Sequence, residues 1–295
     1  MKRQVRHIVG IAVAMGCGIA TGQQNFEGVQ IKATHVAGKV HMLEGRGGNI
    51  GVSVGQDGIL IVDDQYAPLV EKIRAALRDL GKGKPRFVLN THWHGDHTGG
   101  NEAFGRDGTI IAHTNVRKRL STRQELFGRS VGPLPKVALP IITFDKSLSI
   151  HFNGEQIRAI HYPNSHTDGD IVIIFTKSNV VHMGDLFFSG MFPFVDLDHG
   201  GNVEGLIESV GKILAELPKG VKIIPGHGPL STADDLKAYH RMLVETTRIV
   251  RERLKAGKTL EQIKADGLPD PWKPWGAGFI STDKWLESIV KSLSK

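Results

Sequence analysis

Short apolar runs alternate with helical patterns along most of the chain. Residues 58–64 form an apolar run that predicts a buried strand, and the apolar spacing of residues 69–80 after Pro68 predicts an amphipathic helix. Residues 86–90 and 109–112 predict two further strands of this first block.

A second block of strands begins near Pro140. Strands are predicted at residues 141–144, 148–152, 155–161, 170–175, 179–183 and 221–224, with a helix at residues 203–217. The Asn153-Gly154 pair is a hairpin signal between two of them. Each block ends with a helix and another strand, which predicts two packed sheets flanked by helices, an α/β class.

The last part of the chain is helical in pattern. Capping boxes are predicted for Thr232 with Asp235 and for Thr259 with Gln262. The apolar stripe of Trp285, Ile289 and Leu293 predicts a helix face packed on the core, and residues 268–278, rich in proline, predict a connecting loop.

The N-terminus has the pattern of an export signal. Residues 1–6 are basic, and residues 8–20 form an apolar run that is too short to span a bilayer as a helix. The small residues Gly18 and Ala20 allow cleavage before Thr21, and the alternative is a lipid anchor at Cys17. We therefore expect a periplasmic or secreted protein with no transmembrane anchor.

Composition narrows the class of protein. The chain is 40% hydrophobic and 23% charged, which excludes disordered, collagen-like and polytopic membrane classes. Its single cysteine excludes an intramolecular disulfide and a zinc finger built on several thiolates. The net charge of +7 falls to +4 beyond residue 20 (34 basic against 30 acidic residues), so no nucleic-acid partner is expected. The 14 histidines suggest metal or proton chemistry.

Three histidines and an aspartate crowd into the segment that follows the strand ending near Leu89. In an extended segment His92 and His94 point the same way and can bind one cation, while Asp96 and His97 can face a second. Such crowding would be costly without a cation. The segment therefore predicts a metal site that the sheet positions and solvent can reach.

Three later residues have a similar context at predicted strand ends, each with a glycine nearby for close backbone approach: His166, Asp185 and His227. Singly, each could be a loop residue, a cap or a turn. Their shared position favours a joint interpretation in which they complete a two-metal site.

The chain resembles the metallo-β-lactamase-fold hydrolases over roughly residues 38–230. The resemblance rests on Asp63 at the end of a buried strand, on the His-x-His-x-Asp-His motif at residues 92–97, and on the three later residues. It implies a four-layer αβ/βα sandwich with metal ions at one edge. The expected organisation is a signal peptide at residues 1–20, a hydrolase domain at residues 26–230, and a helical extension packed on it at residues 231–295.

The resemblance also implies two Zn²⁺ ions per chain. One would be bound by His92, His94 and His166, and the other by Asp96, His97 and His227. Asp185 would bridge the two ions, and Asp63 would orient a ligand without touching metal. A metal-bound hydroxide would attack a carbonyl, and Asp96 would orient it or move a proton.

The residue at position 185 bears on the subtype. Lactamases with a thiolate ligand have cysteine there, whereas glyoxalase II-like thioesterases, lactonases and ribonuclease Z-like phosphodiesterases have aspartate. Residues 90–101 and 166–172 nevertheless look more like lactamase motifs. We expect an exported hydrolase of amide or ester bonds, with cyclic amides of the β-lactam type leading. A thioester or lactone hydrolase and a non-hydrolytic metal-binding module are the alternatives.

We expect a small-molecule substrate, but the sequence does not identify the residues that bind it. Residues 45–49, rich in glycine, form either a loop that covers the site or an ordinary hairpin turn. Residues 187–194 contain four phenylalanines that form either a pocket wall or core. His182 and His199, near the expected cleft, are interpreted as structural or surface histidines.

Overall fold

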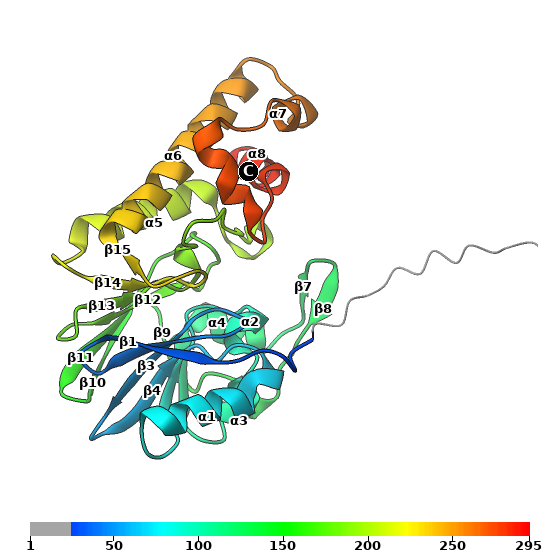
Figure 1. Cartoon of the computed structure of the whole chain (residues 1–295). Helices are drawn as coiled ribbons and strands as arrows, with labels where there is room; N and C mark the ends of the chain where they lie inside the picture. The colour runs from blue at the N-terminus through cyan, green and yellow to red at the C-terminus, as the bar shows by residue number, and fades with distance from the viewer. Residues whose placement is uncertain (1–24) are drawn as a thin grey trace, which may run out of the picture.

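A computed structural model describes residues 25–295, so the predicted export segment at residues 1–20 lies outside the described residues. Two sheets pack face to face with helices on both outer sides (Figure 1). This arrangement confirms the predicted α/β class and four-layer sandwich. Within residues 25–295, no helix has both the length and the apolar character needed to cross a membrane.

The first sheet has seven strands within the described residues, ordered β1-β2-β3-β4-β5-β6-β9. They are β1 (Lys32–Ala37), β2 (Val40–Glu44), β3 (Ile50–Gly55), β4 (Gly58–Val62), β5 (Pro85–Leu89), β6 (Thr109–His113) and β9 (Ile142–Phe144). The first four pair antiparallel, and β4, β5, β6 and β9 run parallel. Because parallel strands end at one edge, the segments after β4 and β5 emerge side by side.

The second sheet has six strands within residues 25–295, ordered β10-β11-β12-β13-β14-β15. They are β10 (Ser147–Phe152), β11 (Glu155–His161), β12 (Ile171–Phe175), β13 (Val180–His182), β14 (Lys222–Ile224) and β15 (Ser231–Thr232). Strands β12 and β13 are antiparallel, whereas β13 and β14 are parallel. The start of β12 and the ends of β13 and β14 therefore lie at the same edge.

The core between the sheets is formed by side chains from both of them, such as Leu60 and Leu89 from the first and Ile171 and Ile224 from the second. On the outer side of the first sheet, Ile73 and Leu77 of α1 (Val70–Leu80) are buried. The predicted amphipathic helix is thus confirmed. Burial of its apolar face stabilises the fold by about 25 cal/mol for each Å² of apolar surface removed from water.

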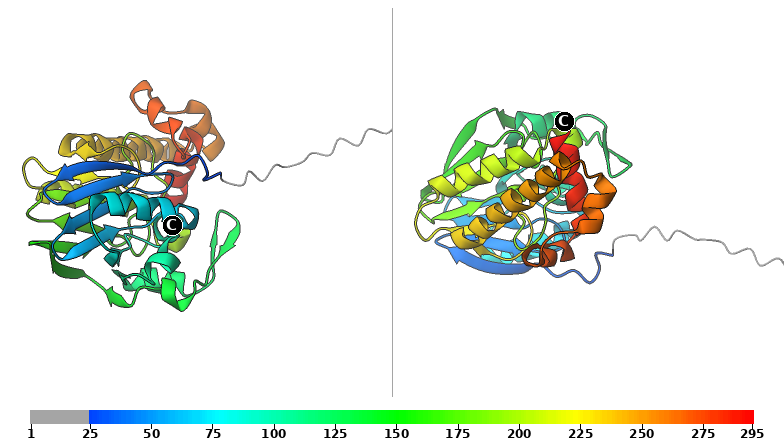
Figure 2. Two further views of the ribbon diagram at one scale, coloured as in Figure 1. Left: turned by 60° about the horizontal axis from the view of Figure 1, so that its bottom comes forward. Right: turned by 90° about the horizontal axis from the view of Figure 1, so that it is seen from above.

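The outer side of the second sheet is covered by α5 (Val203–Glu216), α6 (Ala233–Lys255) and α8 (Thr282–Leu293). Seen from above, α5 and α6 run alongside each other across the sheet (Figure 2). Both predicted capping boxes are present, at the starts of α6 and of α7 (Leu260–Asp266). The expected loop at residues 268–278 is instead mostly the 3₁₀-helix η5 (Asp270–Ala277), since its prolines fix φ near the 3₁₀ range without needing backbone N–H bonds.

A two-stranded hairpin stands apart from both sheets. It consists of β7 (Gln124–Leu126) and β8 (Arg129–Val131) and follows α4 (Thr114–Leu120). In Figure 1 it projects from the first-sheet side of the molecule toward the C-terminal helices. The apolar pattern of this short segment predicts no strand, because three-residue strands carry little periodicity.

Candidate metal centre

All seven predicted ligands lie at one edge of the sandwich. The segment after β5 carries His92, His94, Asp96 and His97, with Gly95–Thr98 forming the single-turn helix α2. His166 precedes β12, Asp185 follows β13 in the 3₁₀-helix η3 (Gly184–Leu186), and His227 follows β14. Strand direction therefore explains why residues far apart in sequence meet here.

One group comprises His92, His94, His166 and Asp185, all buried, with one potential ligand atom of each within 4.8 Å of the others. His94 Nδ1 lies 3.1 Å from His92 Nε2 and 2.9 Å from His166 Nε2. Asp185 Oδ2 is 3.5 Å from His166 Nε2 and 3.8 Å from His92 Nε2. Tetrahedral ligands at zinc distances would be separated by about 3.3–3.6 Å, so this spacing fits a metal ion.

The outward-facing hydrogen bonds assign the protons of these three rings. His166 Nδ1 donates to the Phe194 carbonyl at 2.8 Å, and His94 Nε2 donates to Asp196 Oδ2 at 2.9 Å. Thr91 Oγ1 gives its hydrogen to Asp63, so it accepts from His92 Nδ1. Each ring therefore turns an unprotonated nitrogen inward. Lone pairs about 3 Å apart repel unless a cation lies between them.

The second group comprises Asp96, His97 and His227. His97 Nε2 lies 3.5 Å from His227 Nε2 and 3.7 Å from Asp96 Oδ2, and His227 Nε2 lies 3.3 Å from Asp96 Oδ2. Asp185 Oδ1 reaches this group, 3.0 Å from His97 Nε2, while its Oδ2 faces the first group. A single carboxylate thus offers one oxygen to each group.

Asp63 fixes the orientation of His97. Its buried carboxylate accepts from His97 Nδ1 at 2.8 Å, from Thr91 N at 2.7 Å and from Thr91 Oγ1 at 2.7 Å. Donation from Nδ1 leaves His97 Nε2 without a proton opposite Asp185 Oδ1, a buried oxygen that lacks a hydrogen-bond partner. A proton or a metal cation must therefore lie between these two atoms. The donor set fits a divalent cation on this ground.

The two groups differ in charge. Burial lowers the pKa of His166 to about 4, so the histidine-rich group favours neutral imidazoles. In the other group burial opposes a charged His227, but Asp185 and Asp96 outweigh it and raise its pKa to about 9. Burial likewise opposes a charged Asp96, yet His97 and His227 lower its pKa to about 2. The histidine-rich group therefore presents neutral nitrogens that can bind a cation, whereas the carboxylates of the other group attract positive charge, which either a proton or a metal cation can supply.

Two residues of the site were missed by the sequence interpretation. Asp196 is only 3% exposed and accepts from His94 Nε2, and its oxygens lie 2.7 and 2.8 Å from His199 Nδ1. His199, interpreted from the sequence as a structural or surface histidine, thus belongs to a His94–Asp196–His199 chain of hydrogen bonds, and its ring centroid lies 4.8 Å from that of Trp93. The sequence offers one local signal for this pair: Asp196 and His199 are three residues apart, and two glycines follow His199.

The glycine-rich segment at residues 45–49 connects β2 and β3 and is held against the site. Gly48 N donates to the Asp96 carbonyl, and Gln65 Nε2 donates to the Gly48 carbonyl. Asn49 Nδ2 donates to the carbonyls of Pro225 and Gly228, on either side of His227. A Cβ on Gly48 would lie 2.1 Å from His97 Cε1, so only glycine leaves this ring in place.

The phenylalanines of residues 187–194 divide between the two expected roles. Phe187, Phe188 and Phe192 are buried core residues. Phe194 is partly exposed, and its ring centroid lies 5.6 Å from that of His94 and 5.8 Å from that of His166. The segment is therefore core for most of its length and lines the metal centre at its end.

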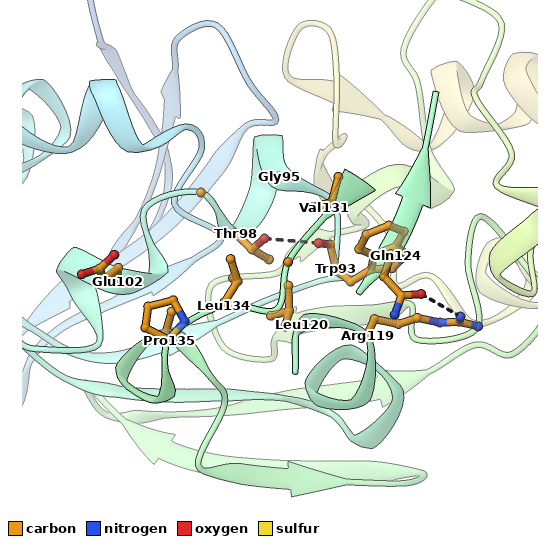
Figure 3. A pocket seen from close by; sticks show the side chains of 13 residues that line it. Trp93, Gly95, Thr98, Glu102, Arg119, Leu120, Gln124, Val131, Leu134 and Pro135 are labelled. Carbon is orange, nitrogen blue, oxygen red and sulfur yellow. Dashed lines mark hydrogen bonds between the residues drawn. The ribbon is translucent and has the colours of Figure 1, made fainter. Parts of the chain in front are cut away.

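A separate cavity of about 130 Å³ lies behind the histidine motif, and none of the seven predicted ligands lines it (Figure 3). Trp93 points into it from between His92 and His94, and its Nε1 has no hydrogen-bond partner. Most of its lining is apolar, including Leu120 and Leu134. The cavity lies below the hairpin, because Gln124 and Val131 also line it.

Comparison with known proteins agrees with this architecture. The model of the metallo-beta-lactamase superfamily matches residues 44–241. A probable metallo-hydrolase of Bacillus subtilis is 30% identical over 182 residues, covering 58% of this chain and 83% of its own length. A hydroxyacylglutathione hydrolase of Nitrosococcus oceani is 31% identical over 144 residues, covering 48% of this chain and 47% of its own. The chain thus matches about half the length of that relative.

Among solved structures, a metallo-beta-lactamase from Pontibacter korlensis superposes with a TM-score of 0.61 at 17% identity, covering 72% of this chain and 99% of its own. At that identity the likeness shows the shared fold.

Proposed function

The chain belongs to the metallo-beta-lactamase superfamily, and we propose that it is a hydrolase that binds two zinc ions and cleaves an acyl bond of a small molecule. The observation that carries this proposal is the inward convergence of unprotonated imidazole nitrogens, with one oxygen of Asp185 directed to each group. Such an arrangement has no satisfactory hydrogen bonding of its own and suits two cations about one carboxylate.

In this proposal His92, His94 and His166 hold one ion, Asp96, His97 and His227 hold the other, and Asp185 bridges them. Bound zinc supplies activation of water near neutral pH and polarisation of a carbonyl oxygen. Asp96 is the ligand carboxylate with the greater access to solvent, its side chain being 22% exposed against 5% for Asp185. We assign Asp96 the role of orienting the attacking water and taking up its proton.

Esters and thioesters are the substrates we favour over cyclic amides. The support is the curated relative named hydroxyacylglutathione hydrolase, together with an aspartate at position 185 where thiolate-containing lactamases have cysteine. Cyclic amides of the β-lactam type remain the second candidate, because residues 90–101 and 166–172 resemble lactamase motifs.

A hydrolase panel on the zinc-loaded protein tests the proposal. A glutathione thioester, an acyl-homoserine lactone and a chromogenic cephalosporin would be assayed in parallel, with and without a chelator. We expect chelator-sensitive hydrolysis of at least one ester-type substrate, two zinc ions per chain by elemental analysis, and loss of activity in Asp185→Asn. Protein that binds no metal when folded and purified would refute the mechanism and the metal-binding alternative together.

We also propose export of the protein, on the support of the basic and apolar pattern of residues 1–20. Mass spectrometry of the native protein distinguishes the two processing routes. Cleavage before Thr21 gives an unmodified N-terminus, whereas a lipidated N-terminal Cys17 gives a larger mass; an intact Met1 would refute export by cleavage.

A further inference from the structure

Two phenylalanine side chains near the metal centre are exposed to solvent. Phe127 is 63% exposed at the tip of the hairpin, and Phe279 is 66% exposed between η5 and α8. Their ring centroids lie 5.9 Å apart, with an interplanar angle of 82°. Two exposed aromatic rings from segments about 150 residues apart thus meet at the surface, where apolar exposure commonly marks a binding site.

Phe194 connects these rings to the metal centre. Its ring centroid lies 4.8 Å from that of Phe127 and within 6 Å of His94 and His166. Its carbonyl accepts from His166 Nδ1, so the position of Phe194 is fixed by a predicted ligand. The three rings therefore form a continuous apolar surface from the metal centre to solvent, which we name the phenylalanine wall (Phe194, Phe127 and Phe279).

The backbone at Phe127 is unfavourable for this residue type. Phe127 and Gly128 are the two central residues of the turn between Leu126 and Arg129, with φ of +50° and +70°. A two-residue turn with both φ values positive favours Asn-Gly, and a bulky residue there is a steric outlier. The turn itself does not explain a phenylalanine at this position. The contact of its ring with Phe194 does explain it.

The base of the hairpin is fixed, so the ring at its tip has a defined position. Gln124 Oε1 accepts from Arg119 Nη1 at 3.2 Å (Figure 3), and Arg119 is in turn paired with Asp168 at 2.6 Å. From this base the hairpin projects toward the side of the molecule that carries α8 (Figure 1). Phe127 is therefore held beside the metal centre by contacts at some distance from its own exposed tip.

We propose that the phenylalanine wall binds the acyl group of the substrate, so that the enzyme acts on carbonyl compounds with a long alkyl or aromatic acyl group in preference to short polar ones. The inference rests on the proposed hydrolase function. The wall starts within 6 Å of two predicted ligands, where the reacting carbonyl would lie, and continues outward along Phe127. An eight-carbon chain, about 9 Å long from its bond lengths, would pass Phe194 and reach Phe127.

Acyl thioesters of one thiol, N-acetylcysteamine, with acetyl to octanoyl groups provide the kinetic test on the zinc-loaded protein. We expect kcat/KM to rise about two- to fourfold per added methylene until the rings are covered. Phe127→Asn, which suits the turn better than phenylalanine does, should lower the octanoyl-to-acetyl ratio roughly fivefold. Ile141→Asn is the matched control: Ile141 is 70% exposed just before β9 and is not part of the wall, so the ratio should stay unchanged.

A binding measurement separates failure of this inference from failure of the proposed function. Calorimetry with acetate and octanoate reports the wall without any turnover, and octanoate should bind at least about tenfold more tightly. Absence of hydrolysis with this preference intact would refute the hydrolase function alone. Equal binding of both acids, or an unchanged preference in Phe127→Asn, would refute the wall. If the unmodified protein sediments as a dimer, and Phe127→Asn sediments as a monomer with an unchanged preference for octanoate, the rings would instead form a contact between two copies of the chain, which would also refute the wall.

Discussion

Replacement of Asp196 tests whether the hydrogen bonds behind the ligands set metal affinity. The carboxylate is nearly inaccessible and accepts from His94 Nε2 at 2.9 Å and from His199 Nδ1 at 2.7 Å. Loss of a carboxylate behind a metal-binding histidine lowers affinity about 10- to 100-fold, which corresponds to roughly 1.4–2.8 kcal/mol. Asp196→Asn keeps one acceptor and should lie near the lower limit, whereas Asp196→Ala leaves the His94 N–H without a partner and should lie near the upper.

The measurement is zinc affinity by competition with a chromophoric chelator. Of the seven predicted ligands, the Asp196 side chain hydrogen-bonds only His94, a member of the histidine-rich group. One of the two zinc-binding steps should therefore weaken, while the affinity of the other changes less than threefold. Asp198→Asn is the matched control, since the Asp198 side chain is 90% exposed and lies 3.7 Å from Lys295. Unchanged affinity at both steps in folded Asp196→Ala would refute the reasoning. Equal weakening of both steps would show a general structural effect instead.

Further predictions concern glycine, metal and the core. Gly48→Ala should displace the His97 ring, 2.1 Å from the added Cβ, and lower metal content to about one ion per chain. Gly95→Ala adds a Cβ with nothing within 4 Å, so elemental analysis should still give two ions, and a reduced content would refute the steric argument. A chelator should lower the melting temperature, since ligand at 100 times its Kd stabilises by about 2.7 kcal/mol; an unchanged Tm in calorimetry would contradict the convergent lone pairs. Trp285→Ala should destabilise by about 3–5 kcal/mol in urea unfolding, because Trp285 is buried and donates to Thr246 Oγ1 at 3.0 Å. A loss under 1 kcal/mol would place α8 outside the cooperative core.

Local signals predicted most of the regular elements. The strand at Glu155–His161 is bounded on one side by the Asn153-Gly154 turn, with both residues at positive φ, and its limits agree with those predicted. The helix predicted at residues 203–217 begins at Val203 and is capped by Asn202, whose side chain accepts from the backbone N–H groups of Glu204 and Gly205. Caps and hairpin turns are local in sequence, which is why the sequence alone indicates them.

Features that depend on distant contacts were not predictable. Nothing near residue 127 indicates that its ring meets Phe194 and Phe279, because those contacts depend on the docking of the hairpin and of the C-terminal helices. The role of Asp196 is similar, since its partner His94 is 102 residues away. The clustering of the seven predicted ligands, by contrast, could be predicted, because their residue types stand at strand ends and match the motifs of the family that the chain resembles.

The first sheet contributes its residues to the candidate metal centre earlier in the chain than the second sheet does. Four of the seven residues follow β5, whereas His166, Asp185 and His227 belong to the second sheet and come later. During synthesis the His92–His97 segment is therefore made long before the site can close, and closure waits for the backbone around His227, to which Asn49 also donates. A chain halted before residue 225 would already contain His92, His94, His166 and Asp185 but would lack His227, so only the second group would be incomplete during synthesis.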